Sequence, residues 1–77
     1  MILKVISAQD ILFQGEVDSV QLPGAEGAFT VLKNHASLIS TLVPGVISYA
    51  HNGQKGEVSV EGGIVDVDNN VVSVCIY

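Results

Sequence analysis

The stretch "KGEVSVEGGIVDVDNNVVSV", residues 55–74, decides the fold because its side chains alternate strictly in polarity. Val58 and Val60 share one face of the first half, and acidic or hydroxyl side chains occupy the other, which is typical of a half-buried antiparallel strand. The alternation resumes after the Gly62-Gly63 pair and again after the "DNN" turn. The side chains expected to point inward in these two later strands are Val65, Val67, Val72, Val74 and Ile76.

Turn signals divide the rest of the chain into further short strands. Asn52-Gly53 is the pair that best tolerates positive φ at both corners of a tight hairpin, and Pro23-Gly24 and Pro44-Gly45 predict two more turns. Before them, apolar residues two apart predict three short strands, at Leu3 and Val5, Ile11 and Phe13, and Val20 and Leu22. The segment 34–42 fits either a short helix capped by Asn34 or a strand, and the strand-rich context favours the strand.

These patterns predict one all-β domain over residues 1–77. We expect a small antiparallel β-sandwich or flattened barrel of about eight to ten short strands, with two sheets that bury alternate side chains against each other. No repeat, linker or low-complexity tract interrupts the 77 residues.

Composition excludes several classes of partner. Three lysines, no arginine and eight acids give a net charge of −5, the wrong sign for a nucleic-acid or anionic-lipid surface. The lone Cys75, expected to be partly buried, cannot form an internal disulfide and fits a reducing compartment. We find neither a signal peptide nor an apolar run of the roughly 20 residues that span a bilayer. Any membrane association is therefore expected to be indirect, through another protein.

The glycine-rich stretch from Leu22 to Leu38 invites a chemical role that its residues do not support. A phosphate loop needs a basic residue, and "GAEGAF" offers Glu26 instead. His35 has Ser37 as its only nearby nucleophile, without the spacing or orienting partner of a catalytic triad. His51 is expected to be solvated beside its turn. No clustered His, Cys or carboxylate ligands predict a metal, so we expect no catalytic residue, cofactor or metal.

An excess of apolar side chains follows the same loop. Residues 28–45, "AFTVLKNHASLISTLVPG", are denser in large aliphatic and aromatic residues than a small sandwich needs to bury. Either all of these residues belong to the core, or some form a surface patch of the kind that marks protein interfaces. The members of this set are Phe29, Val31, Leu32, Leu38, Ile39, Leu42 and Val43.

The order of these motifs resembles the N-terminal domain of the epsilon subunit of F-type ATP synthase. The resemblance covers essentially the whole chain: a first strand, Phe-x-Gly-x-Val, Pro-Gly-x-Glu-Gly, a His-Ala turn and Leu-x-Pro-Gly, then "VEGGIVDVDNNVVSV". Ala28 and Thr30 stand where the family often has an acid and a glycine. Lys33-Asn34 and Ser37 replace the prolines and glycine common around the His-Ala pair.

The resemblance implies a non-catalytic rotor subunit of the central stalk. Such a domain docks on the gamma subunit and on the ring of c subunits, and it helps to couple proton-driven rotation to ATP synthesis. Its location would be peripheral, at the cytoplasmic face of the inner membrane. The family often continues into a C-terminal helical hairpin, so a chain ending at Tyr77 is expected to be a short form without that hairpin.

The resemblance and the apolar stretch together give a candidate subunit interface. Its residues are Pro23, Gly24, Glu26, Gly27, Ala28, Phe29, His35, Ala36 and Leu38. Two other hypotheses stay open from the residues themselves: a stand-alone β-module that binds a peptide or small ligand, and a hydrolase that uses His35.

Overall fold

A computed structural model describes all residues, 1–77, and contains nine strands and no helix. The strand count lies within the predicted eight to ten. The bounds are β1 Ile2–Ile6, β2 Ile11–Glu16, β3 Ser19–Leu22, β4 Phe29–Leu32, β5 Leu38–Leu42, β6 Gly45–His51, β7 Gln54–Val60, β8 Gly63–Asp68 and β9 Val71–Ile76.

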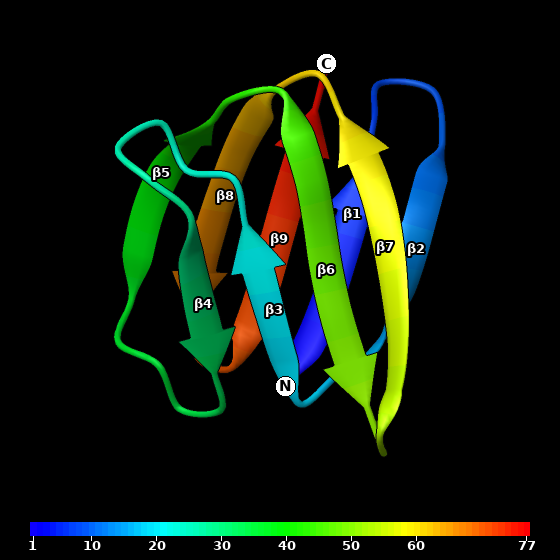
Figure 1. The fold of residues 1–77 in the computed structure, drawn as a ribbon, viewed down its shortest axis with the longest axis vertical. Coiled ribbons are helices and arrows are strands. Elements are labelled where there is room, and N and C mark those ends of the chain that lie inside the picture. The colour runs from blue at the N-terminus through cyan, green and yellow to red at the C-terminus, as the bar shows by residue number, and fades with distance from the viewer.

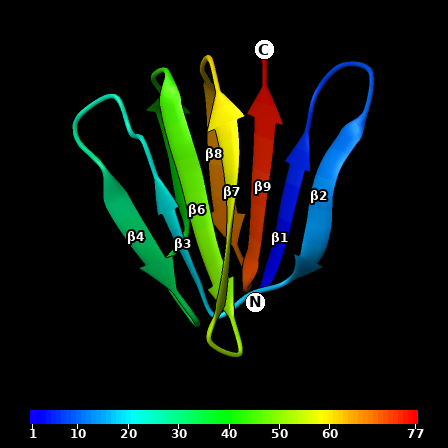
Figure 2. The same ribbon diagram turned by 45° about the vertical axis from the view of Figure 1, so that its right-hand side comes forward.

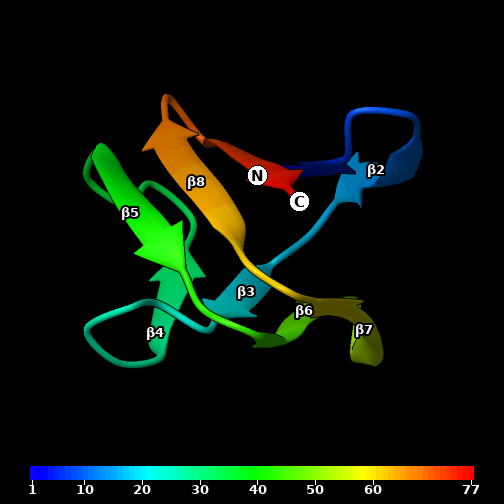
Figure 3. The same ribbon diagram turned by 90° about the horizontal axis from the view of Figure 1, so that it is seen from above.

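The strands form two sheets that face each other, which confirms the predicted β-sandwich (Figure 1). One sheet has the order β2-β1-β9-β8-β5 and the other has the order β4-β3-β6-β7. Seen from above, β4 lies below β5 at one side of the sandwich and β7 lies below β2 at the other (Figure 3). Each of the two sides of the sandwich is therefore bordered by one edge strand from each sheet.

One strand pair differs from the expected all-antiparallel arrangement. β1 and β9 are parallel, in a register that places Leu3 beside Val72 and Val5 beside Val74. Figure 2 shows the consequence, since the chain begins at one end of the sandwich and finishes at the opposite end. Side-chain alternation does not reveal this because it has the same period of two in parallel and antiparallel strands.

The core consists of thirteen buried apolar side chains, twelve from strands of both sheets and Val17 from the connection between β2 and β3. The predicted alternation holds in β8, where Val65 and Val67 are buried while Asp66 and Asp68 are exposed. The apolar stretch 28–45 turns out to be divided: Val31 and Leu42 are buried, and Phe29 and Leu38 are partly buried. Its exposed members are Leu32, Ile39 and Val43.

Asparagines with positive φ form the tight turns at one end of the sandwich. Asn52 and Gly53 have φ values of 51° and 79°, as the hairpin prediction requires. Asn34, at 64°, lies in the turn after β4 and not at a helix N-terminus, so the ambiguous segment 34–42 is a turn followed by the strand β5.

Two predictions about single side chains were wrong. Cys75 is exposed and not partly buried, because the alternation in β9 that buries Val74 points its neighbour outward. His51 is only half-solvated: its ring lies against Asp18, and its Nδ1 atom is covered by protein. The position of Cys75 follows from the alternation of β9 itself, whereas that of His51 depends on Asp18 in a distant loop, which the local sequence does not specify.

An aromatic pair closes the side of the sandwich between β2 and β7. The rings of Phe13 and Tyr49 cross the gap between the sheets, with centroids 4.2 Å apart and planes tilted by 35°. Gly56 leaves room for the Tyr49 ring, since a Cβ at this position would overlap the ring atoms. We call this region the closed side.

Candidate docking cleft

The opposite side, between β4 and β5, holds an open cleft of about 400 Å³. It is bordered by the two edge strands, which come from different sheets and do not pair with each other. We call this region the open side. The residues that line the cleft are Glu26, Gly27, Ala28, Phe29, Leu38, Ile39 and Ser40.

The structure brings together five of the nine predicted interface residues in this cleft, from Glu26 to Phe29 together with Leu38. Pro23 and Gly24 lie in the same loop but do not line the cleft. His35 and Ala36 do not join them, because their turn is at the opposite end of β4 (Figure 1). Ile39 and Ser40 line the cleft but were absent from the predicted interface. The sequence did mark Ile39 as one of the surplus apolar residues of the stretch 28–45, and this could have placed it in the interface.

The loop before β4 is held against the end of β5 by backbone hydrogen bonds. The Ala25 N–H donates to the Thr41 carbonyl at 2.9 Å, and the Val43 N–H donates to the Pro23 carbonyl at 2.9 Å. Gly24 is buried in the bridge opposite Leu42. A Cβ on Gly24 would meet the Phe29 ring at 2.8 Å, so glycine lets this ring lie directly on the loop. The wall of the cleft is thus fixed in place.

The turn that carries His35 has no catalytic arrangement. The Nδ1 atom of His35 lies 2.7 Å from the carbonyl of its neighbour Ala36. The Ser37 hydroxyl donates a hydrogen bond to Asp68 Oδ1 at 2.6 Å. This bond holds the hydroxyl against the turn between β8 and β9. Two hydrogen bonds between Asn34 and Asn70 tie the same two turns together. Serine and histidine therefore do not form the nucleophile and base of a hydrolase.

Asp18 organises the end of the molecule away from the cleft loop. Its Oδ2 accepts a hydrogen bond from the Asn52 N–H at 2.9 Å, and its Oδ1 lies 3.3 Å from Lys33 Nζ. The Asn52 N–H and then the Lys33 side chain lower the pKa of Asp18 below its ordinary value of 3.8. These contacts join three separate connections of the chain, and nothing in them resembles a ligand site.

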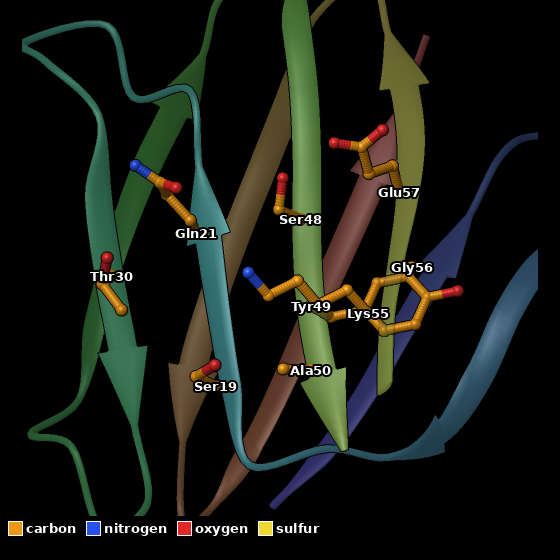
Figure 4. A pocket seen from close by; sticks show the side chains of 9 residues that line it. All are labelled: Ser19, Gln21, Thr30, Ser48, Tyr49, Ala50, Lys55, Gly56 and Glu57. Atoms are coloured by element: carbon orange, nitrogen blue, oxygen red, sulfur yellow. The ribbon is translucent and has the colours of Figure 1, made fainter. Parts of the chain in front are cut away.

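A broad polar groove, of about 600 Å³, runs over the outer face of the four-stranded sheet. Figure 4 shows its floor of short side chains, with Ser19 on β3, Thr30 on β4 and Ser48 on β6. Lys55 and Glu57 on β7 border it. The groove lacks both an apolar lining and converging charges, the usual marks of a small-molecule site.

The structure contains neither a metal-binding cluster nor a membrane-spanning helix. No three His, Cys, Asp or Glu side chains lie close enough together to hold a metal ion. No helical segment has the length and apolar character that a bilayer span requires.

Fold and site together define the class of the protein as a small β-sandwich domain with an apolar cleft at one side. Comparison with known families then identifies the particular group. Residues 1–76 match the family described as the ATP synthase delta/epsilon chain, β-sandwich domain. The chain belongs to this family.

Relatives with assigned names agree with the family match. The chain is 46% identical over 72 residues to an ATP synthase epsilon chain of Leptospira borgpetersenii. It is 44% identical over 69 residues to an ATP synthase epsilon chain of Nitratiruptor. These alignments cover 94% and 88% of the chain but only 57% and 54% of the relatives. The chain therefore spans little more than half the length of these relatives.

Solved structures show the same fold. A chain in the mitochondrial ATP synthase of Euglena gracilis superimposes with a TM-score of 0.92 at 24% identity, over 99% of this chain and 49% of the other. A chain in the central stalk and c-ring structure of the Tetrahymena thermophila enzyme gives a TM-score of 0.81 at 12% identity, over 97% and 61%. The epsilon-type β-sandwich expected from the motifs is confirmed.

Proposed function

We propose that the chain is a non-catalytic rotor subunit of an F-type ATP synthase. In this role it docks on the gamma subunit and the c ring in the central stalk, at the cytoplasmic face of the inner membrane. It helps to couple proton-driven rotation to ATP synthesis. The observation that carries the proposal is the family match over residues 1–76, supported by relatives named as epsilon chains of ATP synthase.

The architecture suits a part that transmits force. Twelve of the thirteen buried side chains come from the two sheets and interlock across the sandwich. Interiors packed in this way have low compressibility and transmit strain. Short turns and cross-links such as the Asn34–Asn70 pair restrain the end of the molecule away from the cleft loop. A domain of this kind moves with the shaft as a rigid body.

The open side is the surface we assign to subunit docking. Its cleft presents Phe29 and Leu38 partly buried and Ile39 74% exposed, and these are apolar side chains that a partner can cover. Burying them on a partner follows the usual pattern of an interface with a few apolar anchors and polar residues around them. Glu26 is the only charged residue that lines the cleft, and it would set orientation.

The test is to purify the ATP synthase from the cells in which this chain occurs, through a tag on a different subunit. Mass spectrometry of the intact proteins then shows whether the chain is present in constant ratio to the gamma subunit. We expect the chain to be retained and to leave only when the rotor is dissociated. If it were absent from the purified enzyme, the rotor proposal would be wrong.

A direct binding assay complements the purification. Recombinant chain is mixed with the isolated gamma subunit, and with gamma and c ring together, and co-elution is followed by size-exclusion chromatography. Stable co-elution with either supports docking. If the chain eluted separately from its partners in both mixtures, docking would be contradicted. The stand-alone β-module would then be the better description.

A further inference from the structure

We propose that the cleft receives an extended segment of a partner chain, which adds as a strand to the free edge of β5 and places a Lys or Arg beside Glu26. This inference rests on the proposed function, because it specifies how the docking surface of the rotor subunit engages its partner.

The first observation is that part of the β5 edge is unpaired. In an antiparallel strand, the N–H and C=O of alternate residues point to opposite edges. The Thr41 carbonyl faces outward, toward Ala25, so the backbone groups of Ile39 face the same way. The Ile39 N–H and C=O and the Thr41 N–H have no hydrogen-bond partner. The two backbone groups of Ile39 are thus ready to pair with another strand, whereas the Thr41 N–H lies beside Ala25 of the loop.

The second observation is the lack of protection on the part of this edge around Ile39, which the loop before β4 leaves uncovered. Proteins normally guard exposed edges with charges, prolines, bulges or shortness. β7 carries Lys55 and Glu57, while β2 carries Glu16 and pairs through a register shift with β1. β4 is only four residues long. β5, "LISTL", has neither a charge nor a proline and pairs with β8 in continuous register.

The third observation concerns what the added strand would meet. Side chains on one face of it would lie against Phe29 and Leu38 in the cleft. Because Glu26 is the only charge in the lining, a cationic side chain is the one that complements it. In strand addition, backbone hydrogen bonds supply affinity and side-chain pockets supply specificity. The partner is therefore an extended segment with apolar side chains and one basic residue.

The test uses ATP synthase from which this chain has been removed. Wild-type or variant chain is then added, and its binding affinity for the depleted enzyme is measured. Ile39→Pro removes the backbone N–H that points outward and leaves the hydrogen bonds to β8 intact. Ile39→Val is the matched control, because it keeps the backbone N–H and has a side chain of similar size. We expect Ile39→Pro to bind about tenfold more weakly than Ile39→Val, the loss for one or two hydrogen bonds. Glu26→Gln should weaken binding about two- to threefold at low salt only.

Three outcomes would overturn parts of the account, and they are distinguishable. If the wild-type chain fails to rebind, the proposed function fails. If it rebinds and the two Ile39 variants bind equally, strand addition is wrong but the function stands. If Glu26→Gln bound with unchanged affinity, the proposed Lys or Arg of the partner beside Glu26 would be ruled out. Should Ile39→Pro not fold, amide exchange in the wild-type complex decides: protection of the Ile39 amide supports strand addition, and free exchange of this amide contradicts it.

Discussion

The two sides of this sandwich differ in how the gap between the sheets is occupied. Both are bordered by one edge strand from each sheet, so both leave a gap between the sheets. The closed side partly fills its gap with the Phe13–Tyr49 pair and leaves a smaller hollow of about 310 Å³, bordered by charged residues such as Glu16 and Lys55. The open side leaves a cleft with one acid and apolar walls.

The difference separates stability from binding. A gap filled by the protein's own aromatic rings contributes to the free energy of unfolding, and its polar surroundings discourage association. An apolar cleft left open contributes less to stability and offers surface to a partner. Substitutions on the closed side should therefore change the unfolding free energy, and those on the open side should change binding.

The largest effect is expected for Phe13→Ala on the closed side. Loss of this ring leaves a cavity beside Tyr49 and lowers the free energy of unfolding by about 3 kcal/mol. The control is Leu12→Ala, next to it on β2 but 45% exposed, which should cost no more than about 0.5–1 kcal/mol. Urea denaturation of both variants measures the difference. Equal losses would show that the aromatic pair does not close this side.

Gly56→Ala should have the next largest effect. The added methyl group overlaps the Tyr49 ring, and overpacking of this kind costs about 1–3 kcal/mol. In a Tyr49→Ala background the methyl group has room, so the same substitution should then cost much less. A double-mutant cycle by thermal or urea unfolding measures this coupling. Additive losses would contradict the close fit of the glycine and the ring.

Ile39→Thr probes the open side and should barely change stability. The side chain is largely exposed, so the free energy of unfolding should stay within about 0.5 kcal/mol of wild type. Binding to stripped ATP synthase should fall about tenfold, since an apolar anchor is lost at the interface. Val46→Thr, an exposed apolar residue outside the cleft, is the control and should bind normally. Equal affinities would place the interface elsewhere.

The smallest effect concerns the pH dependence of stability at Asp18. Because its pKa is lower in the folded than in the unfolded chain, its contribution is complete well above pH 3.8 and is lost as the pH falls through the folded-state pKa. The stability gap between wild type and Asp18→Asn should thus be constant near neutrality and shrink in acid. Asp66→Asn, an exposed aspartate without a hydrogen bond, is the control. A gap independent of pH would contradict the lowered pKa.

Much of the fold follows from sequence because alternation and turn chemistry are local. The inward valines of β8 and the Asn52-Gly53 hairpin each depend on residues a few positions apart. The parallel pairing of β1 with β9 does not, since it joins opposite ends of the chain and leaves the two-residue period unchanged. The contacts around His51 likewise come from Asp18, 33 positions earlier.

The candidate site was predictable in part for a related reason. Glu26, Phe29 and Leu38 were found because they lie in one glycine-rich and apolar stretch, and the structure gathers them in the cleft. His35 and Ala36 belong to the same stretch but lie beyond β4, whose length carries them to the other end of the sandwich. Leu38 also lies beyond β4 but returns to the cleft, because it begins β5, which borders the same side. Sequence proximity alone therefore does not decide which residues share a site.

The most direct test of the account compares the two sides in the free and the assembled protein. Hydrogen exchange is measured by mass spectrometry for the isolated chain and for the chain within purified ATP synthase. We predict strong protection on assembly in residues 26–29 and 38–41, and little change around Phe13 and residues 54–56. Protection confined to the closed side, with the cleft exchanging as in the free chain, would contradict the assignment of the open side as the docking surface.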